Sequence, residues 1–250
     1  RSFKDFKFRH RSKKNQIIYT SKKVKNDNDV LNLINNFLTE KNSFIFESVE
    51  KGKIKGRYTI FGKNPDKIWE FNNNNSYLIK NKKKIKLKNK PDKLIEKIIE
   101  DFKFETPKKL PKICSLISGY FSYDSIRYVE KIPDKCKNDL KLPDVRLLRP
   151  RTLVIYDNLK KEIFYIINIF NDEKIKNYSK KYEDVKKELS KILIQSSLTI
   201  THNLQSKTNK KIKVKSNTPK NKFLKMVNKA KQYIKLGDIF QVVLSQRFEA

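Results

Sequence analysis

Short apolar runs separated by turn residues recur between positions 43 and 79, and this spacing limits the possible folds more than any other feature. Lys51-Gly52, Gly62 to Pro65 and Asn72 to Asn75 separate the runs, and these residue types favour tight reversals of the backbone. The pattern predicts an antiparallel meander. Its strands are expected at Ser43 to Val49, Arg57 to Phe61, Ile68 to Phe71 and Tyr77 to Ile79.

Helical periodicity appears in three places before residue 195. A short helix is predicted at Val30 to Leu38, and a second behind Pro91 has one apolar face. A long third helix from Ile175 to Ile192 carries an apolar stripe, which core packing explains without any added function. The second helix has Leu94, Ile95, Ile98, Ile99 and Phe102 on its apolar face.

Two further patterns predict strands. Thr152 to Tyr156 and Ile163 to Phe170 flank Asp157-Asn158, which indicates a hairpin. In the apolar run from Ile113 to Tyr123, Gly119 indicates a bulge or a close approach of another backbone.

The composition changes near residue 195, where a polar, basic stretch without periodicity begins. Beyond it, Thr218 and Pro219 can start a helix that Gly237 ends, and residues 239–248 resemble a mostly buried strand. We predict an α+β protein, with a region of antiparallel sheet or sandwich and helices at 1–195. A linker at 196–217 and the start of an α/β domain at 218–250 follow.

The net charge of +32 raises the possibility of a nucleic-acid-binding protein, because clustered Lys and Arg release counterions from phosphate. The excess is nearly all Lys, however, and it is spread along the chain together with abundant Asn and Ile. An A/T-rich coding sequence produces the same composition, and no nucleic-acid-binding motif accompanies the charge. We expect no nucleic-acid partner. Tight, salt-sensitive binding to DNA or RNA would favour the alternative.

Cysteine and histidine are too few for a disulfide framework or a zinc site. We expect Cys114 and Cys136 to be reduced, and His10 and His202 to lie on the surface. The sequence has no run of about 20 apolar residues and no signal-peptide core, which predicts a cytoplasmic protein without a membrane span. Because the chain starts at Arg1 and stops just after a strand-like run, we expect it to be a fragment of a longer protein.

Four stretches of sequence resemble the large subunit of anthranilate synthase, a chorismate-using family, and they occur in the family's order. The last is the most specific, because it contains the long contiguous match Ala230 to Phe248. Phe46, Thr59 and Ser122 depart from the family's pattern, and Ser122 adds a side chain where the family has Gly. The stretches are 42–50 with 56–62, 119–133, 143–158 and 226–248. Aminodeoxychorismate synthase shares the last stretch and is the alternative enzyme.

The resemblance implies an enzyme that converts chorismate and ammonia to anthranilate and pyruvate. It also implies Mg²⁺, a glutamine amidotransferase subunit that supplies ammonia, and tryptophan as a feedback inhibitor. The magnesium ligands and the acid/base groups belong to the later half of the family's sequence, so this chain alone is expected to be inactive. Gln241 stands where water-adding relatives have Lys, which places it on the nucleophile side of the chorismate pocket. A plain strand residue is the alternative.

The tryptophan site is expected in the first region, at Glu47, Ser48 and Arg57. The resemblance implies that Glu47 and Ser48 border the effector, with the carboxylate of Glu47 able to pair its ammonium. Arg57 is our own addition from its place on the next strand, where it can meet the effector carboxylate or be an ordinary surface charge. Because adjacent strand residues face opposite ways, Glu47 and Ser48 can share a ligand only at a bulge, at a strand end or through backbone.

Overall fold

The computed structural model describes the chain except residues 1, 25–29, 31–39, 48–55, 135–137 and 198–212. Contacts divide it into two compact units, residues 1–201 and 202–250. The division falls within the interval 196–217, and the predicted helix at Val30 to Leu38 lies almost entirely outside the described residues.

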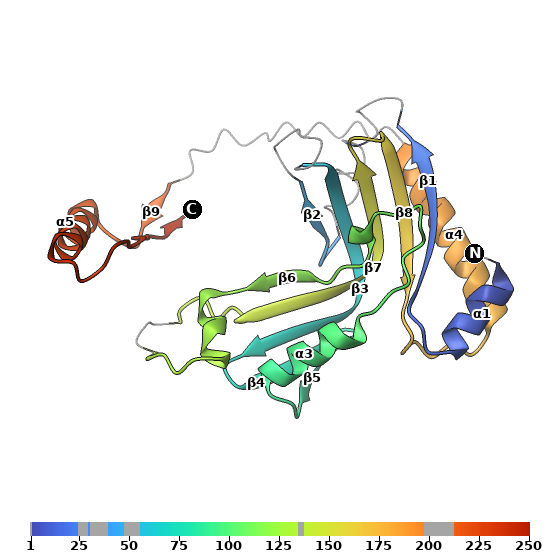
Figure 1. Cartoon of the computed structure of the whole chain (residues 1–250), viewed down its shortest axis with the longest axis horizontal. Coiled ribbons are helices and arrows are strands. Elements are labelled where there is room, and N and C mark those ends of the chain that lie inside the picture. The colour runs from blue at the N-terminus through green and yellow to red at the C-terminus, as the bar shows by residue number, and fades with distance from the viewer. Residues whose placement is uncertain (1, 25–29, 31–39, 48–55, 135–137, 198–212) are drawn as a thin grey trace. The chain divides into compact units, whose positions relative to one another are not determined.

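The first unit is built on one antiparallel sheet with the strand order β1-β8-β7-β3-β4-β5, in which β2 also pairs with β3 and β6 with β7 (Figure 1). Helices pack against it, so the predicted combination of helices with antiparallel sheet is confirmed. The lysine-rich edge strand β5 was not predicted. The bounds are β1 Gln16–Lys23, β2 Phe44–Phe46, β3 Tyr58–Asn72, β4 Asn75–Lys80, β5 Lys83–Leu87, β6 Ser118–Phe121, β7 Val145–Asp157 and β8 Glu162–Ile169.

Strands β3 and β7 pair along nearly their whole length and connect the two parts of the sheet. The turn predicted at Gly62 to Pro65 is wrong, because β3 runs through these residues and its register shifts only between Pro65 and Lys67. Pro65 lies opposite Pro150, and neither residue has an N–H for the ladder. Both strands bend at this part of the sheet, so its two halves run in different directions (Figure 1). Strand β7 supplies hydrogen-bond partners for the backbone of this part of β3, and it therefore holds these residues in the strand.

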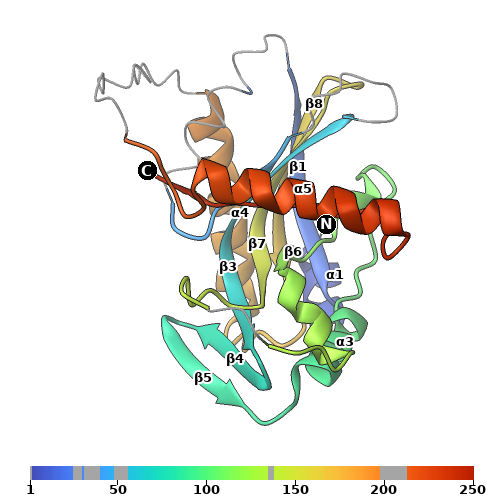
Figure 2. The ribbon, with the colours of Figure 1, turned by 90° about the vertical axis from the view of Figure 1, so that its left-hand side faces the viewer.

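We call the half of the sheet that contains β1 and β8 the upper half, and the half that contains β4, β5 and β6 the lower half. Helix α4 (Tyr178–Ser197) and helix α1 (Phe3–Arg11) cover one face of the upper half (Figure 2). The stripe predicted for α4 is confirmed, since four of its apolar residues are buried against the sheet: Tyr182, Val185, Leu189 and Ile192. Helix α1 was not predicted. The prediction of a surface His10 is wrong, because its side chain is buried and its Nδ1 lies 3.1 Å from Tyr178 Oη. The packing of α1 on α4 buries it.

The opposite face of this half is covered by residues around Leu110 and Cys114, and Cys114 is a free, buried cysteine. In the lower half, helix α3 (Pro91–Asp101) packs its predicted face on Trp69 and Phe71, although Ile99 is exposed. The hairpin β7–β8 is confirmed. Among the described residues, no helix is long and apolar enough to cross a membrane.

Gly119 lies in β6, a shorter strand than the predicted run. The close backbone approach expected there is confirmed, since a Cβ on Gly119 would lie 1.9 Å from the carbonyl oxygen of Arg146.

The second unit contains helix α5 (Lys220–Leu236), and Gly237 ends it with φ of 78° as predicted. Its N-cap position is Pro219 rather than Thr218, and no side chain caps the first turn. The strand predicted at 239–248 is wrong. Only Phe248–Glu249 (β10) pairs, with Lys215–Ser216 (β9), while the described residues between α5 and β10 have no partner strand. A strand needs a neighbour for its backbone groups, and an apolar run alone does not provide one.

Candidate functional site

Two of the predicted effector residues lie at strand ends: Glu47 follows the end of β2, and Arg57 precedes the start of β3. Strand β2 stops at Phe46, so Glu47 is the first residue past a strand end, and it is exposed. Ser48 lies outside the described residues. Phe46 pairs with Ile60, so continuing this antiparallel register places Glu47 opposite Thr59, two residues from Arg57.

Arg57 does not extend freely into solvent, because it forms a two-pronged ion pair with Asp157 at the end of β7. Its Nε and Nη2 donate to the two carboxylate oxygens at 3.1 and 2.8 Å. The guanidinium also lies 4.9 Å from the centre of the Tyr58 ring. Arg57 therefore links the start of β3 to the β7–β8 turn, and among the described residues Nη1 makes no hydrogen bond.

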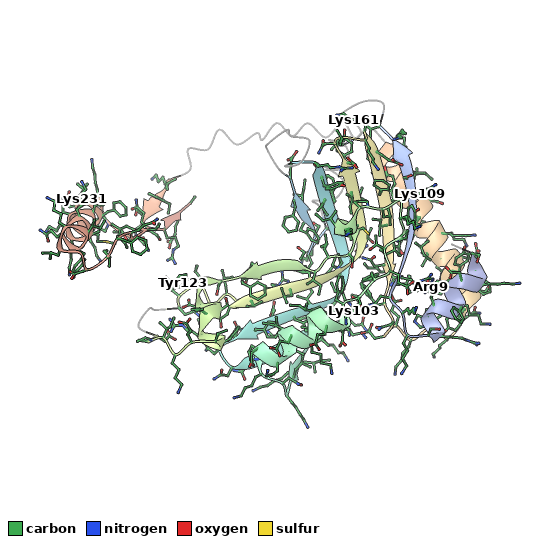
Figure 3. All side chains as sticks on the ribbon, viewed as in Figure 1. Arg9, Lys103, Lys109, Tyr123, Lys161 and Lys231 are labelled. Carbon is green, nitrogen blue, oxygen red and sulfur yellow. The ribbon has the colours of Figure 1, made fainter. Side chains whose placement is uncertain are left out.

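Asp157 is the residue that the sequence analysis missed at this end, since it was taken only as a turn residue. Its side chain is 2% exposed, and Oδ1 also accepts the backbone N–H groups of Leu159 and Lys160, both at 3.1 Å. Burial alone would raise the pKa of this carboxyl, but Arg57 and the backbone donors outweigh it and hold the pKa below its usual range. Lys161, labelled in Figure 3, marks this turn. The sequence around Asp157 indicated only an Asp-Asn turn, because the Arg57 that pairs with Asp157 is 100 residues away along the chain.

Gln241 lies in the second unit, between α5 and β10, with its side chain exposed. Its neighbours are apolar and also exposed, Phe240 at 94% and Val243 at 82%. Together with Val242, they make three exposed apolar side chains within four positions, a surface that water solvates poorly.

The described residues hold no group of three or more His, Cys, Asp or Glu side chains that could bind a metal ion.

A family model described as chorismate binding enzyme matches residues 41–250. The chain belongs to the chorismate binding enzyme family.

Several curated proteins are similar to this chain. Anthranilate synthase component 1 of Acetivibrio thermocellus is 36% identical over 82% of the chain and 42% of its own length. The protein of the same name from Cereibacter sphaeroides is 27% identical over 99% of the chain and 50% of its length. Anthranilate synthase alpha subunit 1, chloroplastic, of Oryza sativa subsp. indica is 32% identical over 83% of the chain and 39% of its length.

A solved structure agrees on the fold. The crystal structure of anthranilate synthase component I from Streptococcus pneumoniae superposes with a TM-score of 0.60 at 24% identity, over 80% of this chain and 43% of that one. The chain spans about half, or less, of the length of the curated relatives it matches, and it corresponds to their N-terminal part.

Proposed function

We propose that the complete protein is the chorismate-using subunit of an anthranilate synthase, which forms anthranilate and pyruvate from chorismate and ammonia. The observation that carries this proposal is the 36% identity to an anthranilate synthase component 1 over 82% of the chain. The family match over residues 41–250 supports chorismate as the substrate.

The proposal includes Mg²⁺ and a glutamine amidotransferase subunit as partners of the complete enzyme, working in the cytoplasm. The designation component 1 in the relatives supports the existence of a second component. We assign the Mg²⁺ ligands to the part of the longer relatives that this chain does not match. The 250-residue chain alone is then inactive.

Gln241 is proposed to line the nucleophile side of the chorismate pocket in the complete enzyme. An amide cannot take a proton from water at neutral pH, which suits a reaction that uses ammonia. The exposed apolar residues on both sides of Gln241 support a role for this segment in packing against further sequence.

The first unit is proposed to sense tryptophan, and the second to begin the catalytic domain. Glu47 follows the end of β2, which is the geometry that lets Glu47 and Ser48 approach one ligand. Arg57 enters this proposal mainly through Nη1, because Asp157 takes its Nε–H and one of the two N–H groups of Nη2.

The test is an assay of the full-length protein with chorismate, Mg²⁺ and ammonium, in which anthranilate is followed by its fluorescence. We expect anthranilate from the full-length protein and none from residues 1–250, which serve as the matched control. Aminodeoxychorismate as the product would refute the proposal and identify the alternative enzyme.

A further inference from the structure

A cavity of about 280 Å³ lies in the lower half of the sheet, under helix α3. Lys103, labelled in Figure 3, follows the C-terminal end of this helix. One wall is apolar, and the others carry charged and amide groups. The apolar wall consists of Trp69, Leu94, Ile98 and Phe102, and the polar lining of Lys67, Lys97, Asp101, Arg149, Asn171 and Asp172.

Arg149 is the most deeply placed charge in this lining, with a side chain only 9% exposed. Its Nε donates to Asp66 at 2.7 Å, and its Nη2 donates to both Asp66 and Asp172. The guanidinium carbon lies 3.8 Å from the centre of the Phe170 ring. Nη1 makes no hydrogen bond among the described residues. Asp66 and Asp172 thus hold the buried guanidinium in place, and the N–H groups of Nη1 remain available as donors.

Three further lining groups lack a partner within the described part of the chain. They are the Lys97 ammonium, the Asp101 carboxylate and Oδ1 of Asn171, whose amide nitrogens donate elsewhere. Lys97 and Asp101 are one turn apart on α3, yet they form no ion pair with each other. The cavity therefore offers donors and acceptors together, beside an apolar wall.

The lining carries three positive charges, on Lys67, Lys97 and Arg149, and two negative charges, on Asp101 and Asp172. Asp66 lies outside the lining, and its ion pair with Arg149 makes the two signs equal. Lys97 and Asp101 are exposed and carry opposite charges, so a ligand that carries one charge of each sign can be paired at both of its ends.

We propose that this cavity binds a small zwitterion, namely an α-amino acid with an apolar side chain. The ligand carboxylate accepts from Arg149 Nη1 and the Lys97 ammonium, while its ammonium donates to Asp101 and Asn171 Oδ1. Its side chain packs on Trp69. This site is separate from the proposed effector residues at the end of β2.

Trp69 is the single tryptophan of the chain, so its fluorescence reports on the cavity. We would titrate residues 1–250 with L-leucine and with L-phenylalanine and follow that emission. We expect a saturable change for both, and binding about tenfold or more weaker for phenethylamine and 3-phenylpropionate, each of which lacks one charge. No saturable change up to about 10 mM of either amino acid would overturn the proposal.

Two exposed acids near the end of α3 give a matched pair of variants. Asp101→Asn should weaken phenylalanine binding about tenfold, whereas Glu100→Gln, outside the cavity lining, should leave it unchanged. Glu47→Gln should also leave it unchanged. A fluorescence response that Glu47→Gln removes and Asp101→Asn preserves would overturn the cavity proposal and support the site at the end of β2.

Discussion

Gly119→Ala tests how closely β6 and β7 approach. The new Cβ would lie 1.9 Å from the Arg146 carbonyl oxygen and 2.9 Å from the Leu147 Cα. A normal contact needs about 3.5 Å, so the strands must separate by more than about 1 Å. The atoms in the way belong to the backbone of β7, where Leu147 pairs with Gly119. Unlike a side chain, they cannot move aside by changing rotamer.

The expected loss of stability follows from that separation. Forced overpacking costs about 1–3 kcal/mol, and one weakened ladder hydrogen bond adds about 1 kcal/mol. The free energy of unfolding should therefore fall by roughly 2–4 kcal/mol. For a unit of this size, that lowers the melting temperature by roughly 5–15 °C.

The measurement is thermal unfolding followed by Trp69 fluorescence, which reports on the first unit. Gly237→Ala is the control: its backbone is left-handed, but no atom lies within 4 Å of the added Cβ, and it belongs to the second unit. Gly237→Ala should leave the melting temperature reported by Trp69 fluorescence unchanged. If Gly119→Ala unfolds within about 1 °C of the unchanged chain, the argument from close strand contact is refuted.

Three further predictions concern the effector, the substrate and pH. In the full-length enzyme, Ser48→Phe should fill the effector pocket and raise the tryptophan concentration for half inhibition more than about tenfold, with ammonia-dependent turnover retained; unchanged inhibition would remove Ser48 from the site. Gln241→Lys should abolish anthranilate formation, and wild-type rates in that assay would place Gln241 away from the nucleophile. For Asp172, burial opposes ionisation, but Arg149 and Lys67 lower its pKa to about 2. Its stabilising contribution is complete above about pH 4 and is lost as the pH falls through about 2. Asp172→Asn should therefore flatten the fall in unfolding free energy over that range, measured by urea denaturation, and an unchanged slope would contradict the assignment.

The sequence alone determined the features that depend on neighbouring residues. Apolar spacing located α3 and α4, the Asp157-Asn158 turn located the β7–β8 hairpin, and Gly237 located the end of α5. Each follows from the periodicity of a single element or from the conformational freedom of one residue, so no distant partner had to be known. The motifs in family order likewise indicated the chorismate binding enzymes.

Only the tertiary structure decided which apolar runs became strands and which polar groups met. Gly62 to Pro65 reads locally as a turn, but the long partner β7 holds it in β3, whereas residues 239–247 find no such partner and stay unpaired. The contact between Arg57 and Asp157 spans 100 positions, and the contact of the buried His10 with Tyr178 of α4 spans 168. Backbone groups and charged side chains pair with whichever partners the fold brings near them. The residues next to them in the sequence do not determine which partners those are.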